Sequence, residues 1–202
     1  GTVVVMSAGN KAQSAPSVMA GARYFYPELS NILVVVAVDP STNILADYSN
    51  KCGMRAQAWC LAAPGMATVP RGQLTAAPTT ADDYAQFAGT SVSAPIVSVV
   101  VALVAQAFPW MTSTQLADTV LTTTTDLGEP GVDAVYGRGL VNAQKAVQGP
   151  AYVGQMFAAA VPAGVEARFN NSISGPGGVA VVGGGVLRLG GENTYTGPTE
   201  IH

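Results

Sequence analysis

Histidine is almost missing from this sequence of 202 residues, since its one histidine is His202. Imidazole is the side chain whose ordinary pKa lies closest to neutrality, so it serves most often as a biological acid or base. A His-ligated zinc site, a Cys–His dyad and a self-contained Ser–His–Asp triad are therefore disfavoured unless the C-terminal tip folds back onto the rest.

Charge is scarce as well. Charged residues make up 10% of the sequence, the net charge is −3, and no basic block occurs. Binding to nucleic acid relies on clusters of Lys and Arg against phosphate, so nucleic acid is not expected as a partner. Hydrophobic residues make up 49% of the chain, and at this length we expect one domain with an appendage.

Cysteine is limited to Cys52 and Cys60. Two cysteines are too few for a disulfide-rich scaffold or a four-thiolate metal site. Because they lie close together, they form either a local disulfide in an oxidising compartment or two free thiols in a core, and we expect the disulfide. The sequence indicates no metal-ligand cluster, so no metal and no cofactor are expected.

A long uncharged stretch over residues 84–115 raises the question of a membrane span. Its apolar centre, residues 96–108, contains Ser98 and Gln106 and is shorter than the roughly 20 apolar residues that a spanning helix needs. We therefore predict a core helix over about residues 90–107.

Residues 1–149 have the pattern of an α/β domain. Residues 2–6 and 32–38 are unbroken β-branched runs, typical of parallel strands covered on both faces. A third short apolar run covers residues 58–63. The remaining elements expected are a hairpin of residues 66–69 and 84–88 around a long polar loop, and helices at 90–107, 113–122 and 142–148.

Glycine becomes much more frequent after Gly149 and Pro150. We predict a linker over residues 150–168. In residues 169–202, short apolar runs at 179–182 and 186–189 alternate with Gly-rich turns. Such short strands need stacked neighbours, so the sequence predicts the first turn or two of a β-solenoid; a flexible Gly-rich tail is the alternative.

One candidate for chemistry is Ser91 in residues 87–95, FAGTSVSAP, which lead into the apolar helix. Unpaired backbone N–H groups and the positive end of the helix dipole converge there, and they would stabilise an oxyanion that forms beside Ser91. The alternative is an ordinary serine at a helix N-terminus.

Ser7, Ala8, Gly9 and Asn10 form a second candidate, because they follow the first predicted strand. The carboxyl ends of parallel strands are where α/β proteins bind ligands, and a carboxamide offers an uncharged N–H donor there. The alternative for Asn10 is a turn residue that caps its own loop.

Taken together, these segments resemble the C-terminal half of the catalytic domain of a subtilase, a serine protease of the subtilisin family. GTSVSAP is similar to the nucleophile loop and VVVMSAGN to the strand that carries the oxyanion asparagine. ILVVVAVD, DYSNKCG and LAAPG fall between them in the family's order, and FPWMTSTQL and YGRGLVNAQKA follow. The resemblance covers about residues 1–148 and implies a three-layer α/β/α fold with a mostly parallel sheet, present as a partial domain.

The resemblance also implies roles for single residues. Ser91 corresponds to the nucleophile, and the Asn10 side chain with the Ser91 backbone N–H corresponds to the oxyanion hole. Ser7, Ala8 and Gly9 correspond to one wall of the pocket for the substrate residue before the cut.

Subtilases order their triad Asp, His, Ser, with the first two upstream of the asparagine. We therefore expect Asp and His in an N-terminal portion of the same protease, absent from this chain, which alone should be inactive. The opening of the sequence directly in a strand-like run agrees with a truncated or cleaved chain.

Residues 169–202 are similar to the repeat that follows protease domains in autotransporter passengers, on FNNSISGPGGV and GGENTYTGPTEI. This implies the start of a β-helix stalk and a secreted or cell-surface serine endopeptidase of a Gram-negative bacterium. Its substrates would be proteins or peptides, and it would meet the outer membrane only through a C-terminal barrel absent from this chain. The alternative function is a non-catalytic, subtilase-like passenger scaffold for binding or spacing.

Overall fold

The computed structural model describes residues 1–70 and 84–202. Its centre is a parallel sheet in the order β1-β2-β3. The three strands are β1 (Val4–Ser7), β2 (Ile32–Val38) and β3 (Cys60–Pro64). All three predicted strands are present. The first and third begin two residues later than expected, since a turn of 3-10 helix, η1 (Gln57–Trp59), precedes β3.

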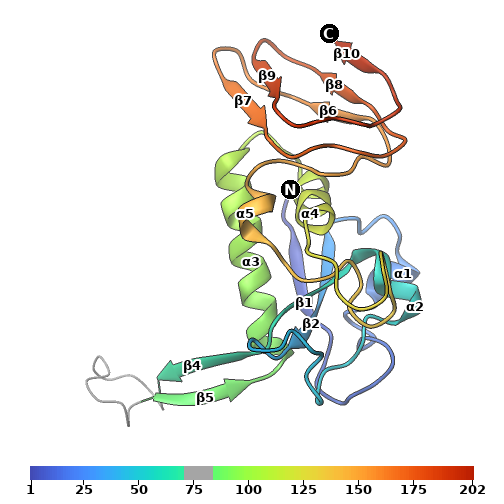
Figure 1. Cartoon of the computed structure of the whole chain (residues 1–202), viewed down its shortest axis with the longest axis vertical. Coiled ribbons are helices and arrows are strands. Elements are labelled where there is room, and N and C mark those ends of the chain that lie inside the picture. The colour runs from blue at the N-terminus through green and yellow to red at the C-terminus, as the bar shows by residue number, and fades with distance from the viewer. Residues whose placement is uncertain (71–83) are drawn as a thin grey trace.

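Both faces of this sheet are covered, which confirms the expected three-layer α/β fold. Every residue of β2 is buried. Leu33 and Val35 pack toward α3 (Thr90–Ala107) and α4 (Ser113–Thr122). Val34 and Val36 belong to the core on the opposite face, where α1 (Ala22–Phe25) and α2 (Gly53–Ala56) lie (Figure 1). Successive side chains of β2 therefore pack alternately into the two hydrophobic cores on opposite faces of the sheet.

Three helices, α3, α4 and α5 (Ala143–Ala146), lie where the sequence predicts them, while the short helices α1 and α2 were not predicted. Thr112 caps α4 and shares a reciprocal capping box with Gln115, as Thr and Gln three residues apart favour. Helix α5 is shorter than predicted and is capped by Asn142. Among the described residues, α3 alone is long and apolar enough to cross a membrane. Its inward face packs on the sheet, so here it serves as the cover of a core.

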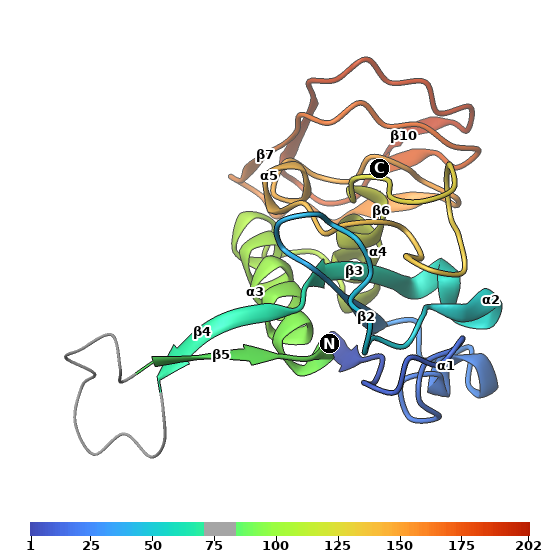
Figure 2. The same ribbon diagram turned by 60° about the horizontal axis from the view of Figure 1, so that its bottom comes forward.

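The predicted hairpin is present as β4 (Met66–Pro70) and β5 (Tyr84–Ala88), paired antiparallel. It projects from the body of the molecule (Figure 2), and β5 leads directly into α3. The long polar loop predicted between these strands lies outside the described residues. The predicted disulfide is present as well, joining Cys52 to the first residue of β3, Cys60.

After Pro150 the chain forms two stacks of short parallel strands, β6-β8-β10 and β7-β9. Successive strands in a stack lie about one coil of chain apart, with Phe157 beside Val179 and Val179 beside Thr199. The strands are β6 (Phe157–Ala159), β7 (Glu166–Phe169), β8 (Val179–Val181), β9 (Val186–Leu189) and β10 (Thr199–Ile201). The segment predicted as a linker, residues 150–168, therefore contains β6 and most of β7.

An aromatic cluster joins the two parts. Phe169 is fully buried and its ring centroid lies 5.3 Å from that of Phe108 and 5.6 Å from that of Phe157. Trp110 lies 6.1 Å from Phe169 on another side. A side chain at Gly149 would collide with the Phe169 ring, so the glycine lets the chain turn tightly there. One hydrophobic core thus runs across the compositional boundary at Gly149 and Pro150.

Candidate active site

Ser91 is the second residue of α3, after Thr90, and the helix is capped by Gly89, which follows the hairpin strand β5. The Ser91 side chain is exposed, and no hydrogen-bond partner of its hydroxyl or backbone N–H occurs among the described residues. The first N–H groups of a helix have no partner within the helix. The Ser91 N–H is therefore available to an external acceptor.

The Asn10 side chain is held against this helix start. Its Oδ1 accepts the backbone N–H of Thr90 at 2.9 Å and the Thr90 hydroxyl at 2.8 Å. The Thr90 Oγ1 in turn accepts the N–H of Gly9 at 3.2 Å. Because the carbonyl end of the carboxamide is fixed by two donors, its Nδ2 must point elsewhere, and this nitrogen has no acceptor among the described residues.

The Asn10 amide and the Ser91 N–H flank one space beside Gly89. A Cβ atom on Gly89 would lie 3.2 Å from Asn10 Nδ2 and 3.7 Å from the Ser91 backbone nitrogen. The structure therefore brings together the two groups that the sequence singled out from segments 80 residues apart. Two N–H donors that border one space can stabilise an oxygen that gains negative charge there.

The predicted pocket residues lie at different depths. Ser7 lines an open groove of about 560 Å³ that also reaches Ser91. Ala8 is fully buried, its N–H donates to the Val35 carbonyl and its own carbonyl accepts the Ser17 N–H. Gly9 is half-buried. The role of Ser7, Ala8 and Gly9 in a substrate pocket stays a prediction. The groove is lined by Val5, Ser7, Ser91, Ala94, Pro95, Ser98 and Val99.

The histidine is far from Ser91. His202 Nε2 lies 3.0 Å from a carboxylate oxygen of Glu200, beyond the outermost strand of the stack. Figure 1 shows this C-terminal end at the opposite side of the molecule from the start of α3. The tip therefore does not fold back to act as a base.

Two buried polar residues that the sequence analysis did not single out support the site. Thr90 is fully buried and orients Asn10, and Asn50 is 2% exposed and binds the loop on the other side of Asn10. Thr90 adjoins Ser91 in the GTSVSAP motif, which could have suggested it. For Asn50 the sequence offers no local signal, because its partners lie about 40 residues away.

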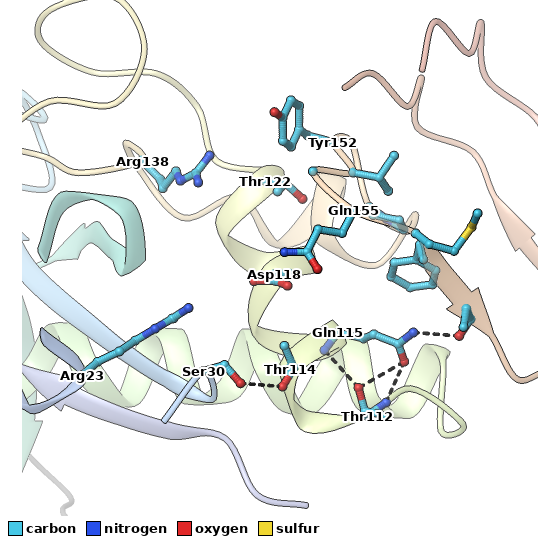
Figure 3. A pocket seen from close by; sticks show the side chains of 16 residues that line it. Arg23, Ser30, Thr112, Thr114, Gln115, Asp118, Thr122, Arg138, Tyr152 and Gln155 are labelled. Carbon is cyan, nitrogen blue, oxygen red and sulfur yellow. Dashed lines mark hydrogen bonds between the residues drawn. The ribbon is translucent and has the colours of Figure 1, made fainter. Parts of the chain in front are cut away.

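A larger cavity of about 590 Å³ lies away from Ser91, between α4 and the chain that leads into β6 (Figure 3). Arg23 and Arg138 point into it from one side and Asp118 from α4. Burial raises the pKa of Asp118, and the two guanidinium groups oppose that shift. Within the described ranges, no three His, Cys, Asp or Glu side chains gather as metal ligands would.

Comparison with known proteins agrees with this arrangement. The chain is 45% identical over 150 residues to serotype-specific antigen 1 of Mannheimia haemolytica, covering 74% of this chain and 16% of that protein. It is 39% identical over 214 residues to the Neisserial autotransporter lipoprotein NalP of Neisseria meningitidis, covering 98% of the chain and 19% of the relative. An extracellular serine protease of Serratia marcescens is 31% identical over 257 residues, covering 100% of this chain and 24% of that protein. The chain thus spans about a fifth of the length of these relatives.

A solved structure matches in fold. The crystal structure of a lanthipeptide protease superposes with a TM-score of 0.53 at 26% identity, over 73% of this chain and 50% of that one. The sequence profile of the subtilase family matches residues 1–139, which include both Asn10 and Ser91. Since that match covers more than half of the sequence, the chain belongs to the subtilase family of serine proteases.

Proposed function

We propose that this chain supplies the nucleophile and the oxyanion hole of a serine endopeptidase. Ser91 is the nucleophile, and the Asn10 amide and the Ser91 backbone N–H bind the oxyanion. The observation that carries this proposal is the convergence of those two donors beside Gly89. The aspartate and the histidine of the triad come from an N-terminal portion of the same protease.

The reaction then runs through an acyl-enzyme. The Ser91 hydroxyl attacks the scissile carbonyl carbon while the histidine takes its proton, and the carbonyl oxygen becomes an oxyanion held by Asn10 and Ser91. Collapse of this intermediate breaks the C–N bond, and the histidine gives its proton to the leaving amine. Water then attacks the carbonyl carbon of the acyl-enzyme while the same histidine takes a proton from it. The bond from that carbon to Ser91 Oγ breaks, the histidine returns the proton to Oγ, and the carboxylic acid product leaves.

The surroundings of Ser91 offer room for the missing portion. Strand β1 pairs with β2 on one side only, and among the described residues its outer edge has no partner. Val99 of α3 lines the groove that reaches Ser91 and is 59% exposed, and Val4 of β1 is 41% exposed. Open edges of parallel strands and exposed apolar side chains favour a further layer of protein there. This supports the proposal that residues 1–149 are the C-terminal part of a catalytic domain.

We further propose that the protein is secreted or held at the cell surface of a Gram-negative bacterium, and that it cleaves proteins or peptides. The relatives from Neisseria and Serratia, an autotransporter lipoprotein and an extracellular serine protease, support this. The Cys52–Cys60 disulfide agrees with an oxidising compartment. The stacked parallel strands after Pro150 are then the start of a β-solenoid stalk.

A fluorophosphonate probe, which reacts with activated serines, tests the proposal. The full-length gene product should be labelled at Ser91, its Ser91→Ala variant should not, and residues 1–202 alone should scarcely react because a base is lacking. Equal labelling of the short and the full-length protein would contradict the missing base. No labelling of the full-length protein would favour the non-catalytic scaffold.

Removal of the oxyanion donor gives a second measurement. Loss of one such donor in subtilisin lowers the rate about 100- to 1000-fold, and we expect a loss of the same order in the Asn10→Ala variant of the full-length protein. The variant should still fold, because the Asn10 side chain is exposed.

A further inference from the structure

We propose that Asn50 is a positioning residue of this site, which holds the loop of Asn10 so that the Asn10 amide stays aligned with the Ser91 N–H. The inference rests on the proposed function and names a residue that acts on the oxyanion hole through another.

Asn50 bonds to the loop on both sides of Asn10. Before Asn10, the Asn50 Nδ2 donates to the Ala8 carbonyl at 3.0 Å, and the Asn50 backbone N–H donates to the Gly9 carbonyl at 2.8 Å. After Asn10, the Asn50 Oδ1 accepts the N–H groups of Lys11 and Gln13, each at 3.0 Å. One side chain thus bridges the entry and the exit of the loop.

The loop backbone needs this support. Ala12 has a φ of 51°, in the left-handed region that residues with a Cβ disfavour. It lies between the two N–H groups that converge on the Asn50 Oδ1. Strained backbone persists where its surroundings over-determine it, and such positions cluster at functional sites.

Asn50 is itself held rigidly. It is 2% exposed, so bonds lost there are not easily replaced by water. Two residues further on, Cys52 forms the disulfide with Cys60, which anchors the segment to β3. The Ser49 hydroxyl donates to the Asn50 carbonyl and accepts the Ala37 N–H of β2. Through Asn50, the loop is therefore tied to the sheet.

Thr90 and Asn50 hold Asn10 from opposite sides of its loop. Thr90 holds the Asn10 carbonyl oxygen toward the nucleophile helix, and Asn50 fixes the backbone from which that side chain extends. If the bonds of the Asn50 side chain are lost, Asn10 can still contact Thr90, but the backbone from which its side chain extends is held less firmly, so its Nδ2 is less well aligned with the Ser91 N–H. An oxyanion donor acts chiefly in the transition state, so the loss should appear in kcat more than in KM.

A double-mutant cycle in the full-length protein tests the inference, with fluorescein-labelled casein and the fluorophosphonate probe as reporters. We expect Asn50→Ala to lower kcat and the labelling rate about 10- to 100-fold, the range for a misplaced catalytic group. In the Asn10→Ala background, where no amide remains to be positioned, the same change should cost less than about threefold.

Thr123→Ala is the matched control. Thr123 is 1% exposed, but its hydroxyl donates to the Thr119 and Val120 carbonyls of α4 and forms no hydrogen bond with residues 8–13 or with Asn50. It should change kcat by less than about threefold in either background. If Asn50→Ala does not fold, Asn50→Asp replaces it, since the carboxylate can still accept from Lys11 and Gln13 while the donor to Ala8 is lost.

The outcomes separate the two proposals. Equal losses from the Asn50 change with and without Asn10, or no loss at all, would overturn the positioning role while Ser91→Ala still abolishes activity. Turnover that survives Ser91→Ala would overturn the proposed function, and the role of Asn50 with it.

Discussion

Strand β2 is buried along its whole length, whereas in β7 and β9 a less exposed residue alternates with an exposed one. The first arrangement needs protein layers on both faces, and α3 on one side and the loops around Cys52 on the other supply them. In the second arrangement, each strand pairs with a strand of the next coil of the chain, as β7 does with β9. The α/β part thus depends on contacts among distant segments, while the stacked part depends on repeated local ones. The aromatic cluster around Phe169 is where these two modes of stabilisation meet.

Loss of the Phe169 ring should have the largest effect on that junction. We expect Phe169→Ala to lower the free energy of unfolding by about 3–5 kcal/mol, because the ring is fully buried among Phe108, Trp110 and Phe157. Chemical denaturation followed by circular dichroism measures it. Phe87→Ala, at a 51% exposed phenylalanine of the hairpin, is the control and should cost far less. A stack that melts separately while the α/β part keeps its stability would show that the core is not shared.

Removal of the disulfide should affect the α/β part alone. We expect replacement of Cys52 and Cys60 by serine to cost about 2–3 kcal/mol, since the bridge restricts the unfolded chain over a short loop. Hydrogen exchange should then quicken around residues 49–63 and stay unchanged in β8 and β9. Equal loss of protection in both parts would mean that the two unfold as one unit.

A polar link across the junction offers a smaller change. The Gln115 Nε2 donates to the Ala158 carbonyl at 2.8 Å, while its Oε1 accepts the Thr112 N–H in the capping box. Gln115→Glu keeps the cap but loses the donor, so we expect a loss of about 1 kcal/mol in urea denaturation. Thr112→Ala is the complementary variant, because it breaks the cap and leaves the link. If Gln115→Glu costs nothing, the link does not stabilise the junction.

The smallest effect concerns charge in the cavity between the two parts. Burial raises the pKa of Asp118, so this carboxyl binds a proton more readily in the folded state than in the unfolded state. The protein therefore loses stability as the pH rises from the unfolded-state pKa through the raised folded-state pKa. Asp118→Asn should therefore stabilise the protein at neutral pH, by less than about 0.5 kcal/mol, and should have no effect where the carboxyl is protonated in both states.

The pKa of Asp39 is shifted in the opposite direction to that of Asp118. Hydrogen bonds from Ser41 and Thr42 lower its pKa, so its contribution to stability is present at neutral pH and is lost as the pH falls through the lowered value. Thermal melts of Asp118→Asn and Asp39→Asn across a pH series should change in opposite directions at neutral pH. A common direction would contradict the assignment of the two shifts.

The parts of the fold that the sequence predicts are those with a local cause. Residues 32–38 form β2 because a run of β-branched side chains suits a strand buried on both faces, and Thr112 starts α4 because its hydroxyl caps the first turn. At β6 the sequence predicts a linker, because its three residues carry no periodic pattern; the structure shows them as a strand paired with the distant β8.

The candidate site divides in the same way. Ser91 and Asn10 stand in recognisable motifs, so the sequence indicates them, and the structure adds that they face one space. Their functional roles stay predictions. The supporting residues are set by tertiary contacts: the partners of Asn50 lie about 40 residues away, and no turn or helix pattern around Ser49 and Lys51 points to them.

The coil-to-coil pairing of the stacked strands also has a consequence for the order in which the protein folds. Val179 meets Thr199 across one coil, whereas Asn10 meets Thr90 only after 80 residues have been brought together. Closing a longer loop costs more conformational entropy, and contacts between near neighbours form faster. The contacts of the stack therefore cost less loop-closure entropy than the contact between Asn10 and the start of α3. The proposed oxyanion hole is complete only when these two distant segments have come together.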